Sequence, residues 1–407
     1  MKSMVVSFLT VLCILSFHAG LVSAQAQTSI KEDSQQALKG LDSFFQSQID
    51  SLQLAGISAC IIKDGHIAWS GGYGLAELET RSPVTPNTLF HMGSTSKTVT
   101  AALLMRLWEQ GEFGLDDDIN RYLPFFVRNP RYPNNSITFR MLLTHTSSIS
   151  DVRPGKGTLT FLNENRDAET PLEEVLRGYL VVGGEYYTET NYRDSAPGDR
   201  YEYSNISFSL IGYIIERMAG RSFADVCREI LFDPLKMKNS TWRLSEVNLD
   251  HFAFQYRRDP QTGKNRVKVL PFTWPGYMDG GLRTTANEYG NFLIMMANRG
   301  SFEGSQVLKP ATVDTMLSIQ NLDGIPPGRA FPTVGHALLW ILSRVNHRDI
   351  FQMNGFGTGF FTQVYFDPKS RIGGAFFITG EFNSLPVMGD FVTTTCKELL
   401  NASDRLQ

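Results

Sequence analysis

The apolar residues of this 407-residue chain change their spacing along the sequence, and that change limits the folds available to it. Near the start, GISACIIKDGHIAWSGGYG (56–74) contains two strand-like runs around Lys63-Asp64-Gly65, and Asp-Gly is a strong hairpin signal. In the last hundred residues, turn residues separate short apolar runs in ALLWILS (337–343), GFFTQVYF (359–366) and IGGAFFIT (372–379). Strand-forming segments at both ends of a chain predict one antiparallel sheet assembled from the two termini.

The residues between these ends are richer in helix-forming segments. Apolar residues at helical spacing, several of them followed by Gly or Pro, predict helices over residues 32–54, 98–110, 207–219, 224–232, 286–298, 310–320 and 386–400. The expected fold class is therefore α/β of the α+β type, with an antiparallel sheet flanked by helices and a mostly helical inserted subdomain. We expect a single domain over residues 25–407, divided into a sheet subdomain (about 25–93 and 280–407) and a helical subdomain (about 94–279).

Residues 1–24 have the pattern of a secretory signal peptide. Lys2 is followed by an apolar stretch (5–17) and then by the small residues Val22, Ser23 and Ala24. The apolar stretch is short for a bilayer span, and no later segment approaches ~20 uncharged apolar residues. We expect an exported protein, secreted or periplasmic, without a membrane span.

Composition excludes several other classes of protein. The formal charge is −3 with no long block of one sign, so no electrostatic footprint for nucleic acid is present. Cys60, Cys227 and Cys396 would remain after cleavage, too few for a disulfide framework, and Cys60 in ISACII is predicted to be a buried apolar residue. The His residues are scattered and His-Glu-x-x-His is absent, so neither a metal site nor another cofactor is expected.

Asn-x-Ser/Thr sequons, which are weak evidence for glycosylation, begin at Asn134, Asn205, Asn239 and Asn401.

Ser94 and Lys97 lie three residues apart in FHMGSTSKTVTAALL (90–104), where a loop turns into a helix. On a helix this spacing puts both side chains on one face, so the amine could reach the hydroxyl. A serine becomes a nucleophile when a base lies within hydrogen-bond reach, and a desolvated lysine can be that base. The alternative is an ordinary helix start with Ser94 or Thr95 as its cap.

Two further stretches could carry chemistry. Tyr203-Ser204-Asn205 precedes a predicted helix, where the phenol of Tyr203 could relay a proton if its pKa fell beside a cation, and Asn205 could bind a substrate amide. The alternative is that Tyr203 packs and Ser204 or Asn205 caps the helix. In NGFGTGFFTQVYF (354–366) the glycines would let a ligand approach the backbone, although a glycine-rich hairpin or bulge has the same pattern.

In this order, Ser-x-x-Lys, Tyr-x-Asn and a glycine-containing strand motif resemble the serine β-lactamase and penicillin-binding-protein superfamily. The Tyr of the second motif is similar to the class C β-lactamase branch, with its carboxypeptidase and esterase relatives. ITFRMLLTHTSSI (137–149), PGDRYEYSN (197–205) and DGGLRTTANEYGNFL (279–293) are also similar to that branch. The resemblance extends from about residue 54 to the C-terminal helix.

The resemblance implies a role for each matching residue. Ser94 would be the acylated nucleophile, Lys97 its proton partner and Tyr203 a second acid/base group. Asn205 would orient Lys97 and the substrate. The oxyanion would be held by the backbone N–H groups of Ser94 and of Phe356, which follows Gly355.

One position departs from the family pattern. Aligned through Gly355 and Gly359, Met353 stands where the third motif usually has Lys or His. A thioether cannot anchor a substrate carboxylate, and losing a charged hydrogen-bond partner costs ~1.5–3 kcal/mol. The resemblance with this departure implies an exported serine hydrolase acting on an ester or amide of a small-molecule or short-peptide acyl substrate, rather than an efficient β-lactamase. Phe356, Phe360 and Phe361 could form an apolar wall for it.

Two alternative functions remain open. One is a catalytically silent binding or scaffold protein, and the other is a D-amino-acid peptidase or transpeptidase. The sequence also leaves the oligomeric state open.

Two other patterns are weaker evidence for a functional site. GSTSKT (93–98) resembles part of a phosphate-binding loop but lacks its glycine spacing. His145 in THTSS could join a Ser-His-Asp triad, but no Gly-x-Ser-x-Gly surrounds Ser94, so it is interpreted as a structural hydrogen-bonding histidine.

Overall fold

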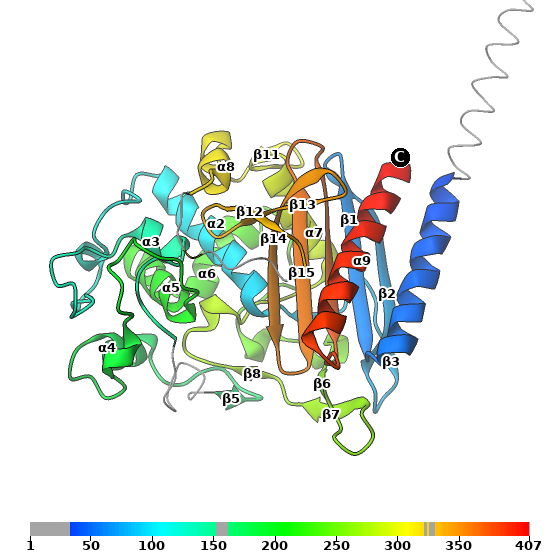
Figure 1. Ribbon diagram of the computed structural model, residues 1–407, viewed down its shortest axis with the longest axis horizontal. Helices are drawn as coiled ribbons and strands as arrows, with labels where there is room; N and C mark the ends of the chain where they lie inside the picture. The colour runs from blue at the N-terminus through cyan, green and yellow to red at the C-terminus, as the bar shows by residue number, and fades with distance from the viewer. Residues whose placement is uncertain (1–32, 152–161, 321–323, 325–329, 407) are drawn as a thin grey trace, which may run out of the picture.

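The computed structural model describes residues 33–151, 162–320, 324 and 330–406, so the predicted signal peptide lies outside the described residues. Its centre is an eight-stranded antiparallel sheet in the order β12-β13-β14-β15-β16-β1-β2-β3 (Figure 1). The strands of this sheet are β1 (Gly56–Lys63), β2 (His66–Glu77), β3 (Ser82–Pro83), β12 (Thr333–His336), β13 (Ile341–Val345), β14 (Arg348–Gly357), β15 (Phe360–Asp367) and β16 (Ile372–Thr379).

The sheet joins the two ends of the chain directly. β1 pairs with β16 along its whole length, from Gly56 opposite Thr379 to Lys63 opposite Ile372. β1 and β2 form the predicted hairpin, and its turn has φ 49° at Asp64 and φ 85° at Gly65. Positive φ at both central residues is what a two-residue type I′ turn requires, which explains the Asp-Gly signal.

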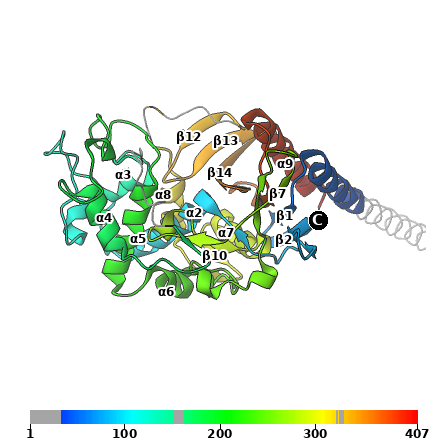
Figure 2. The same cartoon turned by 90° about the horizontal axis from the view of Figure 1, so that it is seen from below.

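Helices cover both faces of the sheet (Figure 2). A helix over residues 33–52 and α9 (Leu385–Arg405) pack on one face, and α2 (Ser96–Glu109) and α7 (Ala286–Ala297) lie on the other. Alternation along β1 supplies both cores, because Ile57, Ala59 and Ile61 belong to the core under α9 while Cys60 and Ile62 belong to the core with α7.

The residues between β3 and β12 hold the remaining elements. The helices there are α3 (Phe139–Leu143), α4 (Leu172–Leu180), α5 (Asn205–Ala219), α6 (Phe223–Cys227) and α8 (Pro310–Leu317). The short helical turns are η1 (Gly93–Thr95), η2 (Ile119–Tyr122), η4 (Glu189–Asn191), η5 (Arg228–Phe232), η6 (Leu244–Glu246), η7 (Leu249–His251) and η8 (Tyr277–Asp279). The short strands are β4 (Phe90–His91), β5 (Asn163–Glu164), β6 (Gln255–Arg258), β7 (Asn265–Val269), β8 (Phe272–Thr273), β9 (Arg283–Thr284), β10 (Ser301–Phe302) and β11 (Ser305–Gln306).

Most predicted elements exist, with shifted ends. The helix predicted over residues 207–219 begins at Asn205 and ends at Ala219, and Gly220, with a φ of 68°, terminates α5. The segment predicted as a helix over 224–232 is helical throughout, as α6 followed directly by a π-helical turn, η5. The apolar run 337–343 is strand only from Ile341 onward, because residues 337–340 form a buried turn between β12 and β13, closed by an Ala337 N–H to Trp340 O hydrogen bond of 2.8 Å.

Other features of the fold bear on the sequence expectations. Cys60 is fully buried, as predicted, and Cys227 and Cys396 are also buried free thiols. Within the described ranges, no helix is long and apolar enough to cross a membrane. The single-domain boundaries and the division into two subdomains stay predictions.

Thr285 caps α7, which packs against the sheet. Its hydroxyl accepts a hydrogen bond of 3.1 Å from the Glu288 N–H. Thr285→Ala leaves this buried N–H without its partner, so we expect the free energy of unfolding in urea to fall by about 1 kcal/mol. Thr394→Ala, at an exposed position inside α9, is the matched control and should leave stability unchanged or slightly raised. Equal stability of the two variants would contradict the role of the cap.

Candidate active site

Ser94 lies in η1, the short turn that leads from β4 into α2. Gly93 has φ 54°, a conformation that favours glycine, and Thr95 Oγ1 donates to Met92 O at 2.8 Å. Ser94 therefore stands just before α2 rather than within it. Lys97, in the first turn of α2, still reaches it, with its Nζ 3.2 Å from Ser94 Oγ.

Lys97 is completely buried, with 0% of its surface exposed. Its amine donates to Ser94 Oγ, to Asn205 Oδ1 at 2.7 Å and to the backbone oxygen of Asp279. Burial lowers the pKa of Lys97 to about 8, although the carboxylates of Asp279 and Asp151 act in the opposite direction. Part of the population therefore carries a free lone pair at neutral pH, as a general base requires.

Tyr203 completes the contact with the nucleophile. Its hydroxyl donates to Ser94 Oγ at 2.5 Å, and Lys97 Nζ lies 5.0 Å from the centroid of its ring. The condition named for proton relay, a fall in the pKa of Tyr203 beside a cation, is not met. Burial raises the pKa, so the phenol stays protonated and acts as a donor. Of the two partners of Ser94, Lys97 is the one that can accept its proton.

Asn205 is held by a carboxylate that the sequence did not single out. Asp151 accepts from Ser204 Oγ at 3.1 Å and from the backbone N–H groups of Asn205 at 2.5 Å and Ile206 at 3.2 Å. These N–H groups lie at the start of α5, where a carboxylate is stabilised. Asp151 thus fixes the first turn of the helix that carries Asn205.

His145 supports the same segment. Its Nδ1 accepts from the Ser204 N–H at 3.2 Å, and its ring centroid lies 4.5 Å from that of Tyr203. Burial holds the pKa of His145 well below its ordinary value, so the ring is neutral. These contacts confirm the prediction of a structural hydrogen-bonding histidine.

Gly355 lets the sheet approach the nucleophile closely. β13 pairs with β14 only up to Gln352, so the edge of β14 beyond it is free on that side. A Cβ on Gly355 would lie 2.2 Å from Met92 O and 2.8 Å from Ser94 N, and one on Gly93 would lie 3.3 Å from Phe356 N. The backbone nitrogens of Ser94 and Phe356 are thereby brought near one another, as an oxyanion hole needs.

Met353 takes no part in this arrangement. Its side chain is 5% exposed and belongs to the apolar core, whereas Phe356 is 64% exposed and lines the cavity beside Ser94. The structure therefore brings together Ser94, Lys97, Tyr203 and Asn205, with Gly355 and Phe356 alongside, and leaves Met353 out.

A second carboxyl group that the sequence did not single out lies beside Lys97. Asp279 is buried, and its Oδ2 accepts from Ser209 Oγ at 2.9 Å and from Trp274 Nε1 at 3.4 Å. Burial raises the pKa of Asp279 to about 7, against the influence of the Lys97 amine. It belongs to DGGLRTTANEYGNFL, so only its place in a similar stretch could have indicated it.

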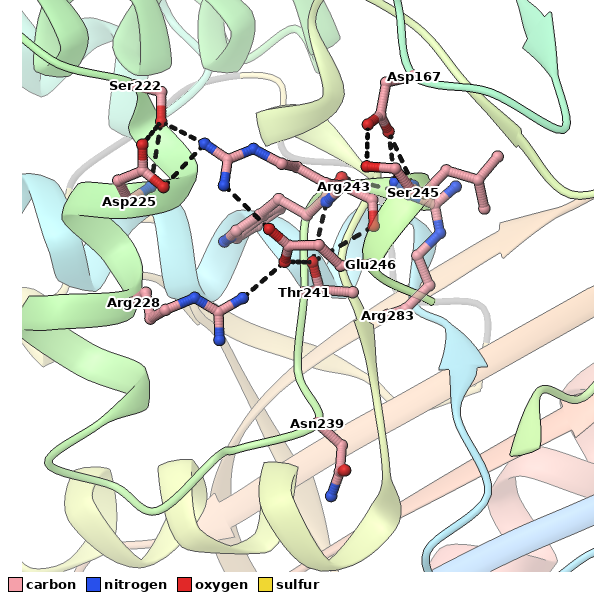
Figure 3. Close-up of polar contacts among 12 residues, drawn as sticks. Asp167, Ser222, Asp225, Arg228, Asn239, Thr241, Arg243, Ser245, Glu246 and Arg283 are labelled. Carbon is pink, nitrogen blue, oxygen red and sulfur yellow. Dashed lines mark hydrogen bonds and ion pairs between the residues drawn. The ribbon is translucent and has the colours of Figure 1, made fainter. Parts of the chain in front are cut away.

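A polar network anchors the chain that follows Asp279 (Figure 3). Arg283 is fully buried and donates to Gly281 O at 2.7 Å and to the backbone oxygen of Phe272. In the same network, Glu246 accepts from Thr241 Oγ1 at 2.6 Å. It also accepts from two arginines, Arg228 at 2.6 Å and Arg243 at 3.0 Å. Arg283 therefore holds the chain two residues after Asp279, whose backbone oxygen accepts from Lys97.

Ser94, Asn205, Asp279 and Phe356 line a cavity of about 650 Å³. Its walls are mainly apolar and aromatic, with Ser94, Asn205 and a few charged groups exposed to it, as is typical of a small-molecule site. The aromatic lining residues among those described are His91, Tyr179, Phe272, Trp274, Phe356 and Phe360. In the described parts of the chain, no group of three His, Cys, Asp or Glu residues is placed to hold a metal ion.

Comparisons with known proteins agree with this geometry. The family model described as Beta-lactamase matches residues 41–392. Penicillin-binding protein 4* of Bacillus subtilis (strain 168) is 29% identical over 236 residues, which are 57% of this chain and 48% of that protein. The chain spans less than half the length of the curated relatives it matches.

Two solved structures have the same fold. The D-amino acid amidase from Ochrobactrum anthropi SV3 superposes with a TM-score of 0.70 at 20% identity, over 91% of this chain and 99% of that chain. EstCE1, described as a hydrolase with promiscuous acyltransferase activity, gives a TM-score of 0.71 at 19% identity, over 91% and 99%. The predicted fold class is confirmed.

The pKa of Lys97 predicts how acylation depends on pH. Below about pH 8 the amine is protonated and cannot accept the Ser94 proton, and above it the amine is free. The rate of Ser94 labelling by a fluorophosphonate should rise about tenfold per pH unit below this value and level off above it. Hydrolysis of the reagent alone, and circular dichroism at each pH, are the controls. A flat profile between pH 6 and 9 would contradict the role of Lys97 as base.

Gly355→Ala tests the close approach of β14 to Ser94. The new methyl group has no room beside Met92 O, so the strand must move away from η1. We expect the free energy of unfolding to fall by about 1–3 kcal/mol and labelling of Ser94 to slow at least tenfold. Gly40→Ala is the control, because a Cβ there meets nothing within 4 Å, and it should raise helix stability slightly. Normal labelling in Gly355→Ala would refute the proposed oxyanion hole.

Proposed function

The chain belongs to the beta-lactamase family, and from this we propose that it is a serine hydrolase that forms an acyl-enzyme on Ser94. The observation that carries the proposal is that one hydroxyl, that of Ser94, contacts both a proton acceptor and a hydrogen-bond donor. The Lys97 amine can take the Ser94 proton, and the Tyr203 phenol donates to the same oxygen. Such a pairing is what a serine nucleophile needs.

Acylation proceeds as follows in this proposal. The proton of Ser94 passes to Lys97 as Ser94 Oγ bonds to the substrate carbonyl carbon. The carbonyl oxygen gains negative charge and accepts hydrogen bonds from the N–H groups of Ser94 and Phe356. The tetrahedral intermediate collapses, the bond to the leaving group breaks, and the Lys97 ammonium returns the proton to the leaving group through Tyr203.

Deacylation reverses these roles. A water molecule loses a proton to Lys97, its oxygen attacks the acyl carbon, and Ser94 Oγ leaves and recovers a proton. Asn205 keeps the Lys97 amine in place through its Oδ1 and can offer its amide group to the substrate.

The substrate class we propose is an ester or amide with a bulky apolar part. The aromatic walls of the cavity favour such a body, and the buried thioether of Met353 offers no cation to a β-lactam carboxylate. An amidase and a hydrolase with acyltransferase activity share the fold, and a penicillin-binding protein is a relative, so D-peptidase action is the narrower alternative.

Two further statements belong to the proposal. Action outside the cytoplasm rests on the signal-like sequence of residues 1–24 alone. A catalytically silent scaffold is the rival from another class, motivated by Met353; the intact contacts around Ser94 favour the hydrolase over it.

Labelling and a substrate panel test the function. Incubation with a fluorophosphonate should give a mass increase on Ser94, and Ser94→Ala should show none and lose more than about a thousandfold in turnover. Among p-nitrophenyl esters, D-phenylalanine amide, a D-Ala-D-Ala peptide and a chromogenic cephalosporin, we expect the ester or amide to exceed the cephalosporin roughly ten- to hundredfold in kcat/KM.

Ser96→Ala is an unsuitable control because Ser96 Oγ accepts from the Leu282 N–H, so Ser305→Ala, at an exposed position of β11, serves instead. Absence of any adduct across reagents and pH, with folded protein, would sink the hydrolase and leave the scaffold.

A further inference from the structure

Two cations line the cavity among the described residues, Arg257 and Lys268, and they differ in their partners. Lys268 forms an ion pair with Glu77, and its Nζ lies 3.6 Å from the centroid of the Phe254 ring. Within the described parts of the chain, the exposed Arg257 has no hydrogen-bond or ion-pair partner. Its neighbour Arg258 donates to the backbone oxygens of Glu381 and others. Among the described residues, Arg257 is thus the cavity cation whose guanidinium has no protein partner and can meet a ligand.

Strand geometry directs Arg257 toward the cavity. Alternate residues of a strand share a face, so Arg257 lies on the same side of β6 as Gln255. Gln255 Nε2 is 2.8 Å from Nδ1 of His91, a cavity residue. Val269, the partner of Gln255 across the β6–β7 hairpin, also lines the cavity.

The carboxyl groups of the same cavity leave this cation uncompensated. Asp151 is engaged by the first N–H groups of α5, and Asp279 is buried beside Lys97. Glu164, on β5, is exposed and forms no ion pair with Arg257. A guanidinium with free N–H donors matches a carboxylate, which it can bind through two parallel hydrogen bonds.

We propose that Arg257 is a specificity-determining residue that binds a carboxylate of the substrate while the apolar body of that substrate lies against the aromatic wall. The proposal rests on the hydrolase function proposed above and adds to it a preference for an anionic ester or amide over its neutral counterpart. The cation comes from β6, whereas Met353 is on β14 and packs in the core, so this recognition does not use the third motif.

Two pairs of esters test the proposal. In one pair the carboxylate is on the acyl part (mono-p-nitrophenyl glutarate and its methyl ester), and in the other it is on the leaving phenol. For each pair we measure the ratio of kcat/KM for the anionic ester to that for the neutral ester. Arg257→Gln should lower this ratio about five- to tenfold in at least one pair, and high salt should lower it in the unaltered protein.

Matched variants separate this effect from a general change in charge. Arg266→Gln removes the same charge from an exposed position of the same hairpin that does not line the cavity, and should leave the ratios unchanged. Arg257→Lys should keep part of the preference, because it retains the charge without the fork. Glu164→Gln should raise the ratio of kcat/KM for the anionic ester to that for the neutral ester, because it removes a negative charge from the cavity wall. Ratios within twofold of the unaltered protein for Arg257→Gln in both pairs would overturn the proposal.

The role of Arg257 can still be tested if the hydrolase proposal is wrong. Turnover of the neutral esters reports on Ser94 chemistry independently of the anion ratios. If no ester is turned over, binding of monomethyl glutarate to the Ser94→Ala protein is measured by ligand-observed NMR. Weaker binding when Arg257→Gln is added supports the carboxylate site, and unchanged or absent binding refutes it.

Discussion

The burial of the Lys97 amine is the constraint on which the rest of the site depends. An amine without any exposed surface needs hydrogen-bond acceptors on several sides, because its hydration has been lost. The acceptors come from three separate parts of the chain: Ser94 in η1, Asn205 in α5 and the backbone oxygen of Asp279 in η8. Each part has its own support, from β14 behind η1, from Asp151 at the start of α5, and from the buried Arg283 after η8. Supporting groups of this kind hold reacting atoms in productive positions.

The same burial gives the two neighbours of Ser94 different protonation behaviour. Desolvation lowers the pKa of the Lys97 amine and raises that of the Tyr203 phenol, because in each case the charged form is disfavoured. One environment therefore makes the amine easier to deprotonate and the phenol harder to deprotonate, on either side of a single hydroxyl. Had Tyr203 been a phenolate, it would compete with Lys97 for the proton of Ser94 instead of donating to its oxygen.

The sequence predicted the parts of this protein that depend on local signals or on ordered motifs. The β1–β2 hairpin followed from Asp64-Gly65, the start of α2 beside Ser94 was placed within two residues, and Ser94, Lys97, Tyr203 and Asn205 do meet. It did not reveal Asp151 or Asp279, because no local sequence pattern predicts which distant N–H group or amine a carboxylate will contact. It also could not decide whether the pKa of Tyr203 falls or rises, since that direction depends on burial, which the spacing of residues in the sequence does not report. The turn at residues 337–340 was missed for a related reason: a buried apolar turn has the composition of a strand.

The pairing of β1 with β16 has a consequence for how the molecule matures. The turn that carries Ser94 is synthesised before β14, whose edge lies against it, and before β16, which lies between β15 and β1. Contacts of such sequence separation form late and slowly, because a long loop must close before they contribute. A growing chain thus contains the Ser94 turn before the strands that complete the pocket, and the pocket forms only after β14, β15 and β16 have been made and paired.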